Sequence, residues 1–361
     1  MSGFFPDPLT KAQLSDSEIN ASLDLLTRWE IGEEPKSAFL AALHFRGETA
    51  AELAGFARAI LERGSKVVIE RDPASPLLEL CGTGGDRAGF LNISTAAMFV
   101  AAGAGARVVK HGNRGVSSRC GSADVLEALG VSLHLKPSSV PSVLERAGSV
   151  FLLASDFHPV ISSLAPLRKS LAAAGKMTVF NLLGPLLNPA LPEAQLTGIF
   201  NPNQLMFYAE ALGMLGRGVA WAVHGEGLQG DGGVDELSIT GPSKVVAFHK
   251  RNDEAASIRA FIRDFIINPH ELGFSAIESP ELLLGGDAKS NALRIQSILS
   301  GEEVGAARDM IVLNAAAALH LAGFGESLQE SLSLAAESIA SGKASRALDL
   351  LRESSKSHSA D

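Results

Sequence analysis

The sequence is poor in several kinds of residue, and each shortage excludes a class of protein. Only 2 of its 361 residues are cysteine, so we expect no disulfide scaffold and a reducing compartment, the cytoplasm. Acidic residues outnumber basic ones by 40 to 31, which gives a formal net charge of −9. This balance disfavours general attraction to nucleic acid or to anionic membranes. No apolar run reaches membrane-spanning length, and residues 1–20 lack the basic start and apolar core of a secretory signal.

The remaining composition is that of a folded protein with a sizeable core. Hydrophobic residues make up 46% of the chain and charged residues 20%, which argues against extended disorder. Residues 19–64 read as helices only, with Thr49 and Glu52 forming a capping box. Two apolar stripes with helical spacing lie in this region, namely Ile19, Leu23, Leu25, Leu26 and Trp29, then Phe39, Leu40, Leu43 and Phe45. Such stripes are typical of ordinary helical core.

Short apolar runs alternate with helical patterns between residues 77 and 163, which favours a largely parallel sheet. The predicted fold class is α/β, with a small N-terminal all-helical domain and a larger domain whose mainly parallel central sheet is flanked by helices. We expect residues 1–72 to form the helical domain, completed by helices from about 164–216, and residues 73–361 to form the α/β domain. Ligands of such sheets bind beyond the carboxyl ends of the strands.

Two glycine-rich segments follow the first two predicted strands, at residues 77–80 and 106–109. Residues 82–86 lead to a helix at about 96–103, and residues 110–118 lead to a helix at about 122–129. Glycines let backbone N–H groups approach a ligand, and helix N-termini favour anions. Hydroxyls and cations surround both turns, namely Ser94, Thr95, Ser117, Ser118, Ser122, Lys110 and Arg114. One such turn is often only a turn, with serine as a helix cap, but two together predict a site for a ligand with phosphate at both ends.

Four strings in the chain carry a family resemblance: CGTGGD followed by NISTAA, VVKHGNRGVSSRCGSADVLEALGV, FNLLGPLLNPA and VDELSITGP. With these strings the chain resembles the anthranilate phosphoribosyltransferase family, from about Ala21 to Leu351. The resemblance implies transfer of a 5-phosphoribosyl group from 5-phosphoribosyl 1-diphosphate (PRPP) to the amine of anthranilate, a step of tryptophan biosynthesis that releases diphosphate. It also implies Mg²⁺, expected as two ions, and a cytoplasmic homodimer that associates through the N-terminal helices.

The same resemblance assigns candidate site residues. Residues expected to hold the donor are Gly82, Gly85, Asp86, Asn92, Ser94, Thr95, Lys110, Asn113, Arg114, Ser117, Ser118 and Ser122. Residues expected at the acceptor are Gly82, His111, Asn113, His158 and Arg168, and no residue is assigned as a general acid or base. The expected magnesium ligands are Ser94, Asp235 and Glu236.

Each of these assignments has a simpler alternative. An acidic pair after the glycine-rich loop 225–233 is commonly surface charge, although hard carboxylate oxygens suit Mg²⁺. His158 could be a loop histidine, and Arg168 could lie on a solvated helix face, although a guanidinium holds a carboxylate through two parallel hydrogen bonds. Residues 180–189 form either an apolar wall for the acceptor or a connection between domains.

The chain also departs from the family pattern in several places. Phe90-Leu91 replaces Thr-Phe, Arg87 stands where a small residue is usual, and residues 169–176 and 225–233 are longer. These changes keep two rivals open: a paralogue that uses another amine or a nucleobase, and a non-enzymatic relative that binds nucleic acid. The second is disfavoured because the chain is acidic and has no basic stripe with interleaved aromatics.

Overall fold

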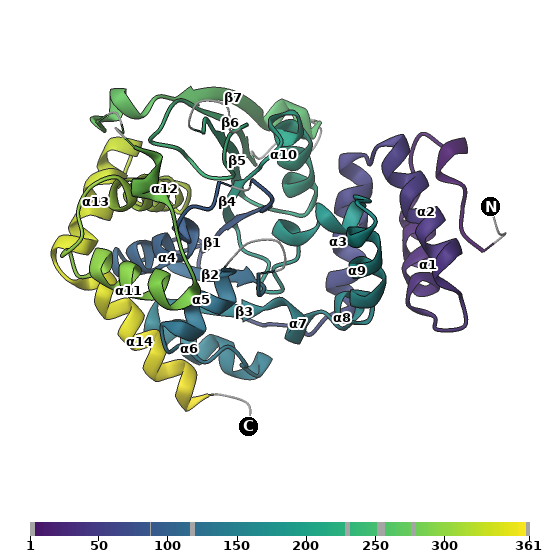
Figure 1. The fold of residues 1–361 in the computed structure, drawn as a ribbon, viewed down its shortest axis with the longest axis horizontal. Helices are drawn as coiled ribbons and strands as arrows, with labels where there is room; N and C mark the ends of the chain where they lie inside the picture. Colours follow the sequence, from purple (N-terminus) through teal and green to yellow (C-terminus); the bar gives the residue numbers. More distant parts are fainter. Residues whose placement is uncertain are drawn as a thin grey trace.

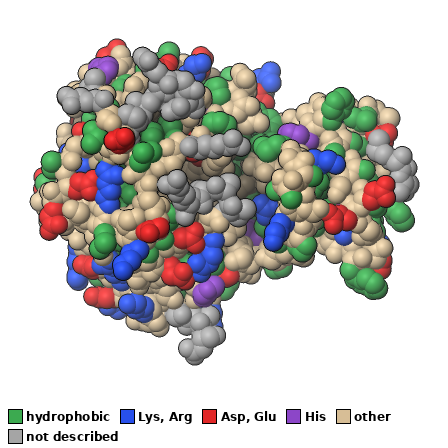
Figure 2. Space-filling model, in the orientation of Figure 1, with side chains coloured by type: hydrophobic (Ala, Val, Ile, Leu, Met, Phe, Trp, Pro, Cys, Tyr) green, Lys and Arg blue, Asp and Glu red, His purple; other side chains and the backbone are tan. Residues whose placement is uncertain are grey.

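The computed structural model describes residues 4–86, 88–115, 120–227, 232–250, 257–275, 277 and 279–358. A helical module that contains the N-terminus lies at one end of an elongated molecule, beside a larger part built on a sheet (Figure 1). Figure 2 shows the module as a lobe of its own, with acidic and basic side chains interspersed over the face drawn. The predicted fold class, a helical domain with a larger α/β domain, is confirmed.

The central sheet has seven strands in the order β3-β2-β1-β4-β5-β6-β7. The strands are β1 (Leu77–Gly82), β2 (Arg107–Gly112), β3 (Ser149–Leu153), β4 (Ala194–Gly198), β5 (Val219–Gly225), β6 (Ser243–His249) and β7 (Ile262–Ile267). Strands β3, β2, β1, β4 and β5 pair in parallel, and β6 and β7 are antiparallel additions. The strands of the parallel part are almost wholly buried, as expected where helices cover both faces.

Helices cover both faces of the sheet. A cluster on one side contains α4 (Ile93–Gly103), α5 (Ser122–Ala128), α6 (Val140–Ala147), α11 (Ala288–Leu299), α12 (Ala306–Leu321), α13 (Leu328–Ala340) and α14 (Lys343–Ser357). On the other side, α10 (Leu205–Met214) packs on β5 and β6 and also on α3 of the helical module. The alternation within β5 fits this division, because Trp221 and Val223 belong to the first cluster and Ala220 and Ala222 to the second.

The helical module consists of α1 (Asp16–Thr27), α2 (Glu33–Arg46) and α3 (Ala50–Arg63), joined by α8 (Pro159–Ser163) and α9 (Ala165–Ala173). Ser15 and Thr49 cap α1 and α3 in capping boxes with Glu18 and Glu52, as predicted for the second pair. One hydrophobic cluster includes residues of all five helices and of α10. The domain boundary at residues 72 and 73 stays a prediction.

Two aromatic residues of the predicted stripes are not part of the core. Trp29 lies beyond the end of α1 and is 87% exposed, and Phe45 is 85% exposed on α2. Neither side chain belongs to a buried helix face, so the interpretation of the stripes as ordinary core does not hold at these two positions. Phe45 follows Leu43 by two positions, and with 3.6 residues per turn it points to nearly the opposite side of the helix. Both side chains therefore face solvent in the single chain.

Short elements connect these parts. They are η1 (Pro8–Thr10), η2 (Pro137–Ser139), α7 (Ala154–Phe157), η3 (Val179–Asn181), η4 (Gly184–Leu186), η5 (Pro202–Gln204), η6 (Ile258–Phe261), η7 (Pro269–Leu272) and η8 (Pro280–Leu283). Among the described residues, no helix has both the length and the apolar character needed to cross a membrane.

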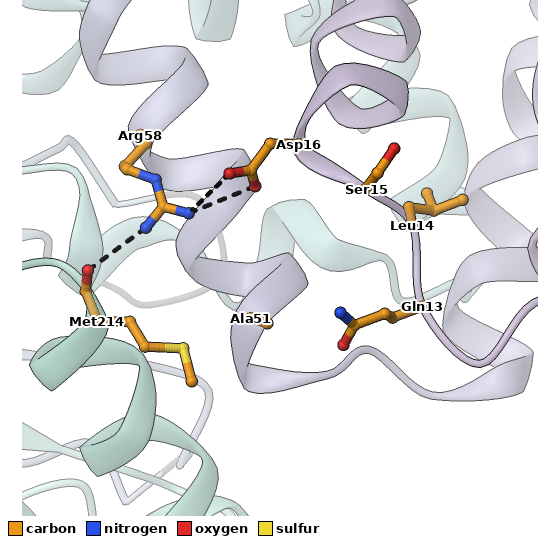
Figure 3. Close-up of a pocket in the computed structure, with 7 residues that line it drawn as sticks. All are labelled: Gln13, Leu14, Ser15, Asp16, Ala51, Arg58 and Met214. Carbon is orange, nitrogen blue, oxygen red and sulfur yellow. Dashed lines mark hydrogen bonds and ion pairs between the residues drawn. The ribbon is translucent and has the colours of Figure 1, made fainter. Parts of the chain in front are cut away.

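A surface hollow of about 420 Å³ lies where α1 and α3 meet the end of α10 (Figure 3). Arg58 of α3 bridges this junction, because its guanidinium donates to the Met214 carbonyl over 3.3 Å and pairs with Asp16 over 3.4 Å. None of the residues that line the hollow is a predicted site residue. We therefore treat it as a feature of the junction between module and sheet.

Candidate active site

The carboxyl ends of β1 and β4 define the candidate site. The chain proceeds from β1 to β2 and β3 on one side, whereas β4 and β5 lie on the other, so strand order reverses between β1 and β4. Parallel sheets bind ligands at such a reversal point. Gly82 and Gly198 are paired at the ends of the two strands, and the Thr83 amide donates to the Gly198 carbonyl over 2.9 Å.

The acidic pair lies at these strand ends. The Gly84 amide donates to Asp235 Oδ2 over 2.6 Å, and the Ser94 amide donates to Glu236 Oε1 over 3.2 Å. The close approach explains the glycine at position 82, since a Cβ there would lie 2.3 Å from Asp235 Oδ2. The segment after β5 thus brings both carboxylates against the first glycine-rich turn and the start of α4.

Asp235 is buried and Glu236 is half-buried, and the ionised forms of both carboxyls are correspondingly disfavoured. Burial raises the pKa of Asp235 well above its ordinary value, and the neighbouring charges of Asp86 and Glu236 raise it further. Burial raises the pKa of Glu236 to about 7, although the Lys110 ammonium opposes that shift. A cation placed between these carboxylates would offset the loss of hydration, so their chemistry fits a hard divalent ion.

The carboxylates do not form a complete metal centre by themselves. Within the described part of the chain, no group of three or more His, Cys, Asp or Glu side chains is arranged to hold a metal ion. Magnesium commonly takes one or two carboxylates and completes its shell with water and substrate phosphate. The acidic pair matches that minimal protein contribution.

Lys110 lies beneath the start of α4. The residue is 2% exposed, and its ammonium donates to the Leu80 carbonyl over 2.6 Å and to Ser94 Oγ over 3.1 Å. Burial lowers the pKa of Lys110, while Glu236 and Asp235 are among the charges that raise it. The structure therefore places this cation beside the acidic pair, although the sequence predicted it beside the ribose 5-phosphate.

The two glycine-rich segments lie side by side. Asn92, the residue before α4, donates from Nδ2 to the Cys120 carbonyl over 3.1 Å. In the first segment Gly85 has φ of +90°, a conformation that favours glycine, and the charge of Asp86 lies close enough to Asp235 to raise its pKa. Thr95 is 1% exposed within the first turn of α4. The expected neighbourhood of the two segments is thus present.

The second segment is held mainly to helix α5. The Asn113 carbonyl accepts from Ser122 Oγ over 3.4 Å, and Arg114 forms a bidentate pair with Glu127 over 2.8 and 3.0 Å. Asp124 also contacts Arg114, over 3.4 Å. The predicted donor residues Ser117 and Ser118 lie outside the described residues. Arg114 is therefore committed to carboxylates, where the sequence suggested a cation free for phosphate.

The predicted acceptor residues form a buried histidine pair and a separate arginine. His111 and His158 meet edge to face, with ring centroids 5.2 Å apart, and His158 Nε2 donates to the Leu187 carbonyl over 2.6 Å. Burial lowers the pKa of both rings. Arg168 on α9 is half-buried, and burial lowers its pKa as well. Within the described part of the chain, its guanidinium has no hydrogen-bond or ion-pair partner.

Two models of one protein family match the two parts of this chain. The family model described as "Glycosyl transferase family, a/b domain" matches residues 74–345, and the one described as "Glycosyl transferase family, helical bundle domain" matches residues 9–64. An anthranilate phosphoribosyltransferase of Rubrobacter xylanophilus is 43% identical over 336 residues, which are 93% of this chain and 92% of the relative. The chain belongs to the anthranilate phosphoribosyltransferase family.

Solved members of the anthranilate phosphoribosyltransferase family share the whole architecture. The enzyme of Thermus thermophilus superposes with a TM-score of 0.84 at 39% identity, covering 97% of this chain and 100% of its own. The Saccharomyces cerevisiae enzyme, solved in complex with PRPP and Mg, superposes with a TM-score of 0.82 at 27% identity, covering 95% of this chain and 94% of its own. The yeast enzyme has also been solved with 4-fluoroanthranilate.

Two buried asparagines that hold the backbone around this site were not predicted as site residues from the sequence. Asn314 of α12 accepts from the Leu237 amide over 3.0 Å and donates to the Leu237 carbonyl over 2.8 Å, next to the acidic pair. Asn291 donates to Asn92 Oδ1 over 3.0 Å. A polar residue within a strongly apolar helix, as in LNAAAAL around Asn314, was the available signal.

Proposed function

We propose that this protein transfers the 5-phosphoribosyl group of PRPP to the amine of anthranilate, with release of diphosphate, in tryptophan biosynthesis. The observation that carries the proposal is the acidic pair Asp235 and Glu236, held against the first glycine-rich turn at the β1/β4 reversal in a member of this family. Breaking the anomeric C–O bond places negative charge on the diphosphate and positive charge on the ribose ring. Catalysis consists mainly of charge stabilisation and positioning.

Magnesium is the proposed cofactor, as two ions. Asp235 and Glu236 would hold it with the Ser94 hydroxyl, and when bound it would neutralise the departing diphosphate. The raised pKa values of both carboxyls support this assignment, because buried anions without a counter-ion are unstable. Lys110 compensates part of the negative charge from below.

The donor site comprises both glycine-rich segments. The diphosphate end is assigned to Gly82, Gly85, Asp86, Asn92, Ser94 and Thr95. The ribose 5-phosphate end is assigned to Asn113, Arg114, Ser117, Ser118 and Ser122. Lys110, which the sequence predicted at that end, is assigned to the diphosphate end, because its ammonium lies beside Ser94 and the acidic pair. The hydrogen bond from Asn92 to the Cys120 carbonyl supports the arrangement, since it joins the start of α4 to the segment before α5.

The acceptor site comprises Gly82, His111, Asn113, His158 and Arg168. Arg168 supports a carboxylate acceptor most directly, because a half-buried guanidinium without a described protein partner favours an anionic ligand. The aromatic amine is nucleophilic once its carboxylate is anchored, so the reaction needs no strong general base. An uncharged nucleobase would leave Arg168 without a partner.

The protein is proposed to act as a cytoplasmic homodimer, divided into a helical domain (residues 1–72, with helices from 164–216) and an α/β domain (residues 73–361). The exposed Trp29 and Phe45 of the helical module support association there, since large apolar side chains are uncommon at such exposure. The free, buried thiols of Cys81 and Cys120 are compatible with a reducing compartment.

The experiment that tests the function follows anthranilate fluorescence in the presence of PRPP and Mg²⁺. We expect consumption that requires both, and that stops when EDTA removes the metal. Adenine and other nucleobases serve as competing acceptors. Binding of PRPP without consumption of anthranilate would refute the proposed acceptor.

A further inference from the structure

The segment 179–189 is held through its carbonyl oxygens by buried side chains from three other elements. The Tyr208 hydroxyl donates to the Leu182 carbonyl, Gln195 Nε2 to the Pro185 carbonyl, and His158 Nε2 to the Leu187 carbonyl, each over 2.6 Å. The segment therefore has a fixed path without belonging to a regular α-helix or strand.

Among these three donors, the orientation of the Gln195 amide is fixed by a further hydrogen bond. Gln195 lies on β4 with no exposed surface, and its Oε1 accepts from Arg217 Nε over 2.7 Å. A guanidinium can only donate, so the amide oxygen must face Arg217 and the NH₂ group must face Pro185. The second N–H of that group is directed at Thr197 Oγ1, 2.9 Å away.

Arg217 in turn lies near a buried acid, although Arg217 Nη2 and Glu79 Oε2 are both buried without a hydrogen-bond partner in the described part of the chain. Arg217 is 1% exposed, and the Glu79 carboxylate, from a residue that is also 1% exposed, favours its charged form. Glu79 accepts from the His111 amide over 3.2 Å, and it lies near the side chain of Asn188, whose Nδ2 donates to the Val109 carbonyl over 2.7 Å. The network thus spans β1, β2, β4 and the held segment.

The network reaches the acceptor site through one peptide. Pro185 accepts the bond from Gln195, and the backbone of the preceding Gly184 lies beside the His111 ring, close enough to influence its pKa. A shift of the Pro185 carbonyl would therefore move the backbone that lies beside the His111 ring. Within the described part of the chain, His111 Nε2 is buried and has no hydrogen-bond partner.

We propose that Gln195, oriented by Arg217, is a positioning residue that sets the shape of the acceptor site through Pro185 and Gly184. The inference rests on the proposed function, because it takes His111 as a residue that lines the anthranilate site. Gln195 itself contacts neither substrate. Its role is to exclude the alternative paths of segment 179–189 that would turn His111 away from the acceptor.

The test exchanges a single group. Gln195→Glu keeps the oxygen that faces Arg217 and replaces the NH₂ that faces the Pro185 carbonyl with a second oxygen. We expect the KM for anthranilate to rise about tenfold, with the KM for PRPP unchanged within about twofold. Amide hydrogen exchange should accelerate in segment 179–189 and stay unchanged in residues 93–103.

Ser149→Ala is the matched control, because it removes a hydroxyl that has no hydrogen-bond partner in the described part of the chain from an equally buried position on β3. It should change neither KM nor the exchange of the segment. Arg217→Lys is the second variant, since it removes the Nε donor but keeps a positive charge near Glu79. It should shift the anthranilate KM in the same direction, and it decides the matter if Gln195→Glu does not fold.

The outcomes separate the inference from the proposed function. A wild-type protein that does not consume anthranilate refutes the proposed function. A wild-type protein that does, together with a folded Gln195→Glu variant whose anthranilate KM is unchanged, refutes only the positioning role. Equal increases in the KM of both substrates also refute it, because they would indicate general loosening of the sheet.

Discussion

Gly198 and Asp235 are in backbone contact, so that a Cβ on Gly198 would lie 1.5 Å from the Asp235 carbonyl oxygen. No side chain at Gly198 can be accommodated unless the acidic pair moves. The contact therefore couples the end of β4 to the proposed metal ligands.

Gly198→Ala should reduce kcat/KM by at least about 100-fold and destabilise the fold by about 1–3 kcal/mol, the usual cost of overpacking. Gly218→Ala is the control, because a Cβ there would lie 3.5 Å from the Glu193 carbonyl, an ordinary contact. Steady-state kinetics and urea unfolding would measure both effects. Full activity of Gly198→Ala would mean that the acidic pair tolerates displacement.

Arg168→Ala should raise the KM for anthranilate about 10- to 100-fold, the range for loss of charge-assisted hydrogen bonds worth about 1.5–3 kcal/mol. The KM for PRPP should stay near the wild-type value, because the proposed donor groups lie on other elements. Lys169→Ala, at the exposed neighbouring position, is the control. Equal losses on the two substrates would contradict the assignment of Arg168.

Glu127→Gln should tighten PRPP binding by up to about fivefold, because a partly exposed ion pair contributes up to about 1 kcal/mol. The reason is that Arg114 must leave its bidentate pair with Glu127 before it can hold a phosphate. Titration calorimetry with PRPP would measure the change, with Glu145→Gln, at an exposed position of α6, as control. Weaker binding would indicate that the pair positions Arg114 for the ligand.

Glu79 should make stability depend on pH in a defined direction. Burial raises its pKa from the ordinary 4.5 to about 7, so the folded protein holds this proton more tightly than the unfolded chain. Its contribution to the free energy of unfolding is complete below pH 4.5 and is lost as the pH rises through about 7. This contribution has an upper bound of about 3 kcal/mol. Urea unfolding between about pH 5 and 8 should show the free-energy difference between wild type and Glu79→Gln falling as pH rises. If the unfolding free energies of the two proteins change with pH in parallel, Glu79 does not titrate in this range.

The proposed dimer should dissociate when Trp29 and Phe45 are both replaced by lysine. Both are more than four-fifths exposed, so the single chain should fold as before. Light scattering after gel filtration should change from twice the chain mass of 37.6 kDa to that mass. Leu293→Lys, exposed on α11 in the larger part of the molecule, is the control. A monomeric wild-type protein would refute the proposal.

Local signals predicted the elements of this protein well. The turn at residues 82–86 and the helix after NIST follow from glycine content and from hydroxyl-bearing residues before an apolar run, both of which act within a few positions. Alternation of strands and helices likewise predicted the parallel sheet. Phe45 was assigned to the same apolar stripe as Leu43 because the two are close in the sequence. Two positions along a helix are nevertheless about 200° apart around its axis.

Long-range partners could not be predicted in the same way. Gly84 and Asp235 are 151 positions apart, and Ser94 and Glu236 are 142 apart, yet each pair forms a direct hydrogen bond. The commitment of Arg114 to Glu127 was equally hidden, because a phosphate ligand and an ion-pair partner both call for the same residue type. Gln195 and Arg217 carried no motif at all.

The sequence by itself determined which residue types stand at the strand ends, and therefore the class of ligand, because backbone freedom and side-chain charge are properties of each residue. Only the tertiary structure decided which charges meet and which are removed from water. Those outcomes depend on strand order and on helices packed from distant parts of the chain, and they set the pKa values and the partners on which the chemistry depends.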